Sequence, residues 1–253
     1  MSKNELKLYY QPLLALGMEA LIRWLHPQWG VVPPLDFIPL AESNGMIMEI
    51  GDWVLREACN QWCHWKAQGL NPGKINVNLS ALQFRSNNLC DSLQRIIQNS
   101  GIDPDALVLE ITESVLMDDA ESTLAQFQAI KALGVRFAVD DFGTGYSSLS
   151  YLKTFPLDYL KIDRTFVRDL ESSSSDLEIV RTIIAMANNL KMELVAEGVE
   201  TPEQLRILSE QGCDYMQGFI LSRPLVAEEF QSQFLASQDQ PPKSLMLCRT
   251  AMA

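Results

Sequence analysis

RFAVDDFGTGYSSLSYL, residues 136–152, is the stretch around which the rest of the chain is organised. It opens with an apolar run of the kind found in strands that are buried on both faces. Two adjacent carboxylates, Asp140 and Asp141, follow the run, and a glycine-rich turn comes next. Successive strand side chains point to opposite sides, so neighbouring acids at a strand end can serve two positions of one site. The alternative is an acidic strand end that caps the following helix.

The same pattern of an apolar run that ends in polar residues recurs along the chain. It predicts eight strands, at 6–12, 18–24, 74–80, 106–114, 136–143, 159–163, 193–197 and 215–219. Helices are predicted at 33–44, 52–68, 87–100, 118–133, 147–154 and 202–211, and one more ends at 189 after a serine-rich turn.

The order of these elements predicts the fold class. The very short link between the first two strands favours an antiparallel hairpin. The later strands alternate with helices, which implies parallel pairing, and eight such strands close into an α/β barrel. No break in composition precedes residue 237, so we expect one domain over 1–236 and a disordered tail over 237–253.

Composition excludes several classes of function. The 253 residues carry a formal net charge of -12, which argues against nucleic-acid binding through a general basic surface. The sequence has neither a signal-peptide core nor an apolar run of the roughly 20 residues that a membrane span needs. We therefore expect a cytoplasmic segment without membrane contact. Five scattered cysteines argue against a disulfide framework.

Polar residues near the strand ends indicate where chemistry takes place. From Asn78 onward they recur every 20 to 36 residues, so each comes from a new strand and all should face one mouth of the barrel. They are Glu19, Asn78, Glu110, Asp140, Asp141, Lys161, Glu197 and Gln217.

Five carboxylates and two amides without histidine or cysteine favour hard cations such as Mg²⁺ or Mn²⁺. The adjacent acids suit two ions, which together can hydrolyse a phosphate ester. Salt-bridge layers inside the barrel are the alternative, but they would need comparable buried cations, and Lys161 alone lies in this layer.

A series of short motifs, all in order, adds a resemblance to a known family. The sequence resembles the EAL-domain family of cyclic di-GMP phosphodiesterases over roughly residues 8–225. The motifs are QP from Gln11, EAL from Glu19, RW from Arg23, VNLS from Val77, LEITES from Leu109, DDFGTGYSSL from Asp140, LKID from Leu160, VAEGVET from Val195, QG from Gln217 and SRP from Ser222.

The resemblance implies a TIM-like (β/α)8 barrel whose first strand is antiparallel. It implies an enzyme that hydrolyses cyclic di-GMP to linear 5′-pGpG with water activated by two Mg²⁺ or Mn²⁺ ions. It also implies a homodimer, and a larger protein with sensor or cyclase domains. Two alternatives are a catalytically silent cyclic di-GMP receptor and a hydrolase of another phosphodiester.

The resemblance also implies roles for individual residues. The catalytic residues would be Glu19, Lys161 and Glu197. The metal ligands would be Glu19, Asn78, Glu110, Asp140, Asp141 and Glu197. Substrate would contact Gln11, Leu21, Arg23, Asp163, Glu200 and Gln217. Glu113 would anchor the loop over residues 142–148, which in the family couples substrate, metals and the dimer contact.

One feature departs from the family pattern. Six residues, 13–18, separate Gln11-Pro12 from Glu19, whereas the family carries a longer hairpin there. Either the hairpin is trimmed, or residues are missing from the chain. The register of Gln11 depends on which alternative holds. The assignment of the metal ligands does not depend on it.

Overall fold

Eight strands form a closed barrel in this computed structural model, which describes residues 5–117, 120–143 and 149–236. The barrel strands are β1 (Leu6–Leu14), β2 (Gly17–His26), β4 (Lys74–Asn78), β5 (Leu107–Thr112), β6 (Arg136–Phe142), β7 (Tyr159–Ile162), β8 (Glu193–Ala196) and β9 (Tyr215–Gln217). Strand β1 pairs antiparallel with β2 and β9, and the other neighbours are parallel. The predicted TIM-like barrel with an antiparallel first strand is therefore confirmed.

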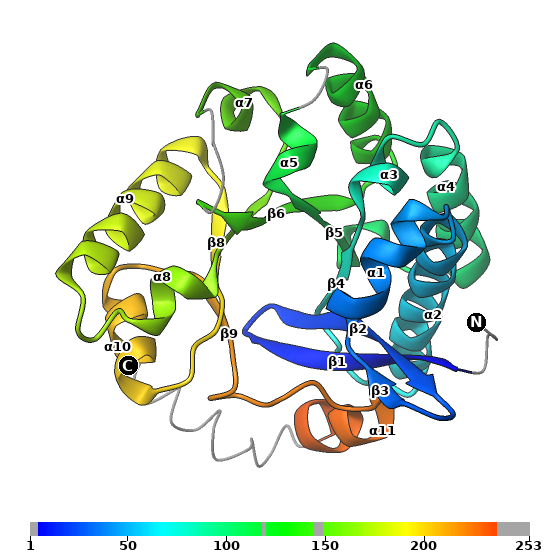
Figure 1. Cartoon of the computed structure of the whole chain (residues 1–253), viewed down its shortest axis with the longest axis horizontal. Coiled ribbons are helices and arrows are strands. Elements are labelled where there is room, and N and C mark those ends of the chain that lie inside the picture. The colour runs from blue at the N-terminus through cyan, green and yellow to red at the C-terminus, as the bar shows by residue number, and fades with distance from the viewer. Residues whose placement is uncertain (1–4, 118–119, 144–148, 237–253) are drawn as a thin grey trace.

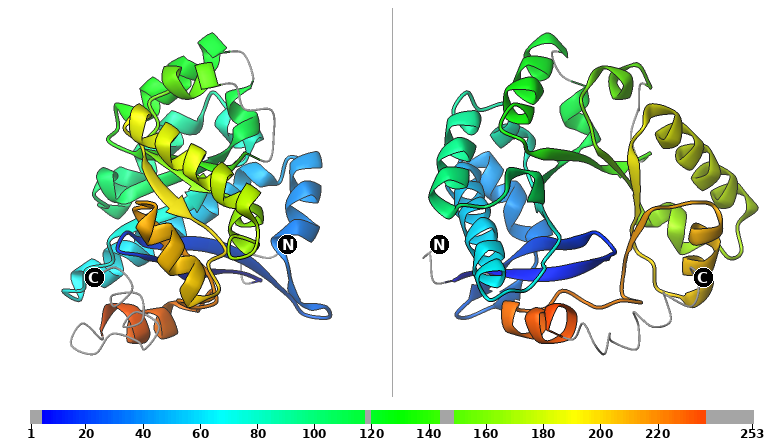
Figure 2. Two further views of the ribbon diagram at one scale, coloured as in Figure 1. Left: turned by 90° about the vertical axis from the view of Figure 1, so that its left-hand side faces the viewer. Right: turned by 180° about the vertical axis from the view of Figure 1, so that it is seen from behind.

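Helices surround the ring of strands, as Figure 1 shows from one end of the barrel and Figure 2 from behind. The longer ones are α1 (Pro34–Ser43), α2 (Ile47–Ala67), α4 (Leu89–Ser100), α6 (Ala120–Lys131), α9 (Ser174–Leu190) and α10 (Pro202–Glu210). Shorter ones are α3 (Ala81–Phe84), α5 (Glu113–Leu116), α7 (Leu149–Thr154), α8 (Arg164–Arg168), α11 (Ala227–Phe230), η1 (Pro104–Ala106) and η2 (Gln231–Leu235). None of the described helices is long and apolar enough to cross a membrane.

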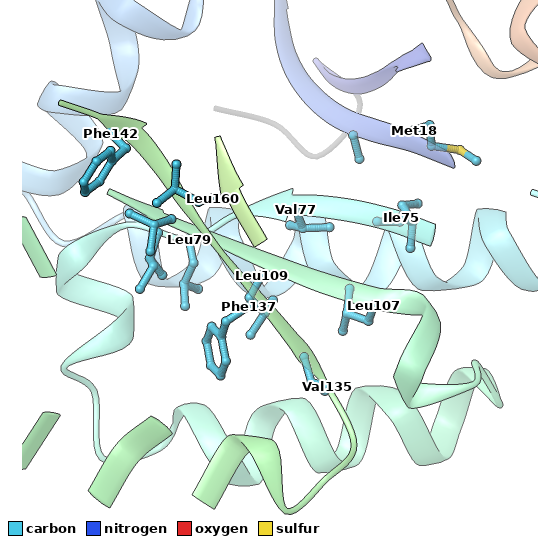
Figure 3. Close-up of a cluster of buried hydrophobic side chains, with 14 of the residues drawn as sticks. Met18, Ile75, Val77, Leu79, Leu107, Leu109, Val135, Phe137, Phe142 and Leu160 are labelled. Atoms are coloured by element: carbon cyan, nitrogen blue, oxygen red, sulfur yellow. The ribbon is translucent and has the colours of Figure 1, made fainter. Parts of the chain in front are cut away.

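Two apolar layers hold the barrel together. The larger one lies between strands and helices, where Ile75, Leu107 and Phe137 are fully buried (Figure 3). The smaller one fills the lower interior of the barrel and consists of Leu13, Leu16, Val108, Ala138, Tyr159 and Val195. Because strand side chains alternate, residues two positions after four of these also point inward, one layer higher. These inward residues are Glu110, Asp140, Lys161 and Glu197.

The short hairpin is compatible with a complete barrel. Strand β1 turns into β2 through Ala15, whose φ of 64° lies in the left-handed region, and Leu16. The pairing places Gln11 opposite Glu19. Leu13 pairs with Gln217 of β9, which closes the ring. The predicted hairpin is therefore confirmed, and Gln11 stays beside the site.

Some element boundaries differ from the prediction. Helix α2 begins at Ile47 rather than at residue 52, because Gly51 continues the helix and packs against Gln83. A ninth strand, β3 (Gly30–Val32), extends β2 as a hairpin and was not predicted. Residues 118–119 and 147–148 of two predicted helices, and the tail predicted over 237–253, lie outside the described residues. The described cysteines form no disulfide.

Candidate functional site

Lys161 is the centre of the site and is almost fully buried, with 1% of its side chain exposed. Its inward position on β7 brings the ammonium to carboxylates on three other strands or strand ends. Nζ lies 2.6 Å from Glu110 Oε2, 2.5 Å from Glu197 Oε1 and 3.1 Å from Asp140 Oδ1. The amide of Asn76 donates to the other Glu110 oxygen at 2.7 Å. One cation thus joins three acids.

Glu19 is the centre of a second group on the neighbouring strands. Asn78 Nδ2 donates to its Oε1 at 2.6 Å, and Gln217 Nε2 donates to its Oε2 at 2.6 Å. Gln217 Nε2 also lies 3.2 Å from Gln11 Oε1, while the Gln11 amide donates to the backbone carbonyl of Ser222. These amides fix the orientation of the Glu19 carboxylate at the inner wall.

Asp140, Asp141 and Glu197 lie together at the carboxyl ends of β6 and β8. One carboxylate oxygen of each lies within 4.8 Å of the others. The pairing of β6 with β7 has a register shift between Val139 and Phe142, and Asp141 adopts a left-handed φ of 54°. Such a bulge redirects side chains near functional sites. Both adjacent acids therefore reach one site instead of opposite faces of the sheet.

The pKa values of these groups reflect burial and crowding. Burial raises the pKa of Glu197 to about 8, since the nearby Lys161 lowers it less than burial and the other acids raise it. Burial likewise raises the pKa of Glu110 well above its ordinary value, and that of Asp141 moderately. Burial alone would lower the pKa of Lys161, but the surrounding carboxylates outweigh it and the pKa lies well above the ordinary value.

A cavity of about 240 Å³ opens above these groups. Its walls are Gln11, Glu19, Leu21, Asp140, Arg164, Glu197, Gly198, Glu200, Gln217, Gly218 and Phe219. A larger cavity of about 520 Å³ lies on the outer wall between β1, α2 and α11. The smaller one is lined by Glu19, Asp140 and Glu197, so it is the candidate active site.

Two of the predicted substrate contacts, Arg23 and Asp163, lie outside the wall of this cavity. Arg23 shares the inward face of β2 with Glu19, and its guanidinium donates to the carbonyl of Ile22 at 2.8 Å. Asp163 accepts a hydrogen bond from the backbone of Thr165 at the start of α8. Its carboxylate is close enough to Asp141 to raise the pKa of that residue.

Glu113 is the predicted loop anchor. It is buried, and neither carboxylate oxygen has a hydrogen-bond partner within the described residues. Residues 144–148 of the loop that it would hold lie outside the described residues.

Two polar residues of the site, Asn76 and Arg164, were not predicted from the sequence. Asn76 is fully buried and orients Glu110. Its position two residues before Asn78 on one strand was a usable signal, because both must face inward. Arg164 contributes a cation to the cavity wall from the start of α8. Nothing in the strand pattern indicates a residue that follows the strand.

Comparison with known proteins assigns the chain to a family. Residues 1–224 match the family model described as EAL domain. The chain is 46% identical over 235 residues to the bifunctional diguanylate cyclase/cyclic di-GMP phosphodiesterase MucR of Pseudomonas aeruginosa, covering 90% of this chain and 34% of MucR. It is 43% identical over 251 residues to the cyclic di-GMP phosphodiesterase NbdA of the same organism, covering 96% of this chain and 32% of NbdA. The chain thus spans about a third of the length of these relatives.

Solved structures agree with the sequence comparison. The MucR phosphodiesterase in complex with c-di-GMP superimposes with a TM-score of 0.87 at 46% identity, covering 90% of this chain and 95% of that one. The EAL enzyme Bd1971, bound to cAMP and cyclic di-GMP, gives a TM-score of 0.86 at 31% identity, with coverage of 90% and 64%. On the family match and these similarities, the chain belongs to the EAL-domain family.

Proposed function

We propose that this chain is a metal-dependent phosphodiesterase that hydrolyses cyclic di-GMP to linear 5′-pGpG. The single observation that supports this best is a group of five carboxylates, three of which contact one buried lysine, beside a cavity of about 240 Å³. MucR and NbdA, whose names include this activity, are 46% and 43% identical to the chain.

The donor set fits two hard divalent cations. Five acids face one ammonium, and such an excess of negative charge favours either raised pKa values or bound cations. The buried oxygens Asn76 Oδ1 and Gln217 Oε1 have no hydrogen-bond partner within the described residues, which leaves them free to orient toward a cation or its water. Oxygen donors without histidine or cysteine select Mg²⁺ or Mn²⁺.

We assign the ligands from the resemblance to the EAL-domain family. Glu19, Asn78, Glu110 and Asp140 would hold one ion, Asp141 would bridge toward the second, and Glu197 would complete it. When bound, two such ions polarise a phosphoryl oxygen and lower the pKa of a water molecule.

The protein itself supplies orientation and proton transfer. Lys161, fixed by three carboxylates, would donate a hydrogen bond to the attacking water or to the phosphate. Glu197 holds Lys161 through Oε1 and lies with Asp140 and Asp141. It can thus bind a cation and accept a proton from water. Both functions need the carboxylate form, which a nearby cation favours.

The walls of the cavity would bind the nucleotide. Gln11 and Gln217 form one side and Leu21 and Glu200 line the same cavity. Arg23 would reach a phosphate by leaving its contact with Ile22. We place Asp163 near the substrate through its proximity to Asp141, and Arg164 as a second cation for the phosphates.

The remaining proposals concern regulation and assembly. A buried carboxylate without a partner among the described residues suits the role of Glu113 as anchor of the loop after Asp141. That loop would couple the site to a homodimer contact. We also propose that the chain works within a longer protein that carries sensor or cyclase domains, because it spans about a third of MucR and NbdA.

One assay tests the proposed function. The chain is incubated with cyclic di-GMP, with and without Mg²⁺ or Mn²⁺, and the products are separated by chromatography. We expect pGpG only with metal, and further cleavage of pGpG to be much slower. Metal-independent cleavage, or a different product, would contradict the proposal.

Glu19→Ala separates the enzyme from a silent receptor. We expect the variant to lose turnover while it retains part of its affinity for the nucleotide. A parent protein that binds cyclic di-GMP yet never cleaves it with either metal would be a receptor. A third possibility is a hydrolase of another diester. Competition by cyclic di-GMP against cleavage of a chromogenic diester distinguishes this hydrolase from the cyclic di-GMP phosphodiesterase and from the receptor.

A further inference from the structure

Phe219 is an apolar side chain in a cavity whose lining residues are mostly polar. It lies two residues after Gln217 in the cavity wall, and 47% of its surface is exposed. The guanidinium of Arg223 lies over its ring, 4.1 Å from the centroid. A ring this exposed contributes little to the core, so packing does not explain an aromatic residue here.

The backbone holds Phe219 rigidly at the cavity. Val199 donates to the carbonyl of Gln217 at 3.0 Å, and Ile220 donates to the carbonyl of Val199 at 3.0 Å. Gly218 packs so closely on Val199 that an added Cβ would lie 2.0 Å from its carbonyl oxygen. Residues 217–220 are therefore tied to the loop after β8, and the ring is presented on a fixed support.

We propose that Phe219 and Arg223 form a stacking platform for one purine base of the substrate, so that they set affinity for a nucleotide rather than for a bare diester. This inference rests on the proposed function. Aromatic rings and guanidinium planes are the groups on which bases stack in proteins. The platform borders the same cavity as the acids, so a phosphodiester bound over the acids brings its own base toward the ring.

The test compares Phe219→Ala with the parent on two substrates. Removing one base–aromatic stack weakens binding by roughly 5- to 150-fold. We expect KM for cyclic di-GMP to rise about tenfold with kcat within about threefold of the parent. Phe219→Trp should keep KM near the parent value. Turnover of methyl p-nitrophenyl phosphate, which has no base, should be unaffected by either change.

A second exposed aromatic residue, Trp29, provides the control for Phe219→Ala. Trp29→Ala removes another exposed aromatic side chain, which is 69% exposed and does not line the cavity, and it should leave the turnover of both substrates unaffected. An unchanged KM in Phe219→Ala, or an equal loss on both diesters, would overturn the platform. If the parent binds cyclic di-GMP without cleaving it, the proposed function is wrong. The dissociation constant for cyclic di-GMP then still tests the stacking platform. A tenfold weaker Kd in Phe219→Ala supports the platform, and an unchanged Kd overturns it. A parent that does not bind the nucleotide overturns both.

Discussion

Replacing Lys161 by methionine tests the electrostatic design of the site. The ammonium lies within 3.1 Å of three carboxylates and is 1% exposed, so the change leaves buried acids without their cation. Breaking a buried ion pair from one side costs about 3–5 kcal/mol. For a chain of this size that lowers Tm by roughly 6–20 °C.

The pH dependence of this loss follows from the same acids. Burial raises the pKa values of Glu110 and Glu197, the latter to about 8. Below pH 8 Glu197 can take up a proton and relieve the repulsion, so the loss should be smaller at pH 6 than at pH 8.5. Saturating Mn²⁺ should restore part of the stability, because the cation replaces the missing positive charge.

Lys161→Met should also lower the catalytic activity, and Lys131→Met is its control. If Lys161 positions the attacking water, kcat should fall by about 10²–10⁴-fold. Lys131→Met removes a partly exposed lysine whose partner Asp158 keeps its bonds from Arg136 and from the backbone of Phe137. That change should cost at most about 1 kcal/mol and leave kcat unchanged. Thermal melts measure the stability of both variants, and steady-state rates measure their kcat, in metal-free and in Mn²⁺ buffers. Equal melting and turnover of Lys161→Met and the parent would refute the reasoning.

Three further predictions follow from the buried and paired carboxylates. Without metal, a raised Glu197 pKa means that the folded state binds more protons than the unfolded one between pH 4.5 and about 8, so stability falls as pH rises through that range. The Tm increase caused by Mn²⁺ should therefore grow from pH 6 to 8.5, and Glu197→Gln should flatten this trend in thermal melts. Asn76→Ala removes a buried amide that orients a carboxylate, so calorimetry should show Mn²⁺ affinity reduced by about 10–100-fold. Hydrogen bonds from Lys74 and Arg136 lower the pKa of Asp105 below its usual 3.8. The stability that these hydrogen bonds contribute is therefore present at neutral pH and is lost as the pH falls through the lowered pKa of Asp105. Asp105→Asn should cost up to about 1 kcal/mol at pH 7, and the difference should shrink below pH 4 in urea titrations; a difference that persists there would contradict the assignment.

The sequence predicted the barrel and its acids because both depend on local signals. Each strand is an apolar run, and alternation fixes which of its residues face inward. Glu110 and Lys161 therefore converge as expected, although 51 residues separate them. The antiparallel first strand was predictable from the shortness of the link alone.

Features that depend on tertiary contacts could not be predicted in this way. Helix α2 was predicted to begin at residue 52, but the preceding Gly51 lies inside the helix, and the side chain of Gln83 occupies the space that a Cβ on it would need. The left-handed Asp141 comes from a register shift in the pairing of β6 with β7, which alternation along one strand does not indicate. Phe219 was predicted as the last residue of a strand over 215–219, but β9 ends at Gln217, so alternation does not give the direction of this side chain.

Anomalous diffraction from crystals soaked in MnCl₂ tests the central proposal most directly. Two peaks should appear about 3.5–4 Å apart. One should contact Glu19, Asn78, Glu110 and Asp140, and the other Glu197, with Asp141 between them. No peak at these residues, or a single peak elsewhere on the barrel, would contradict a two-metal phosphodiesterase.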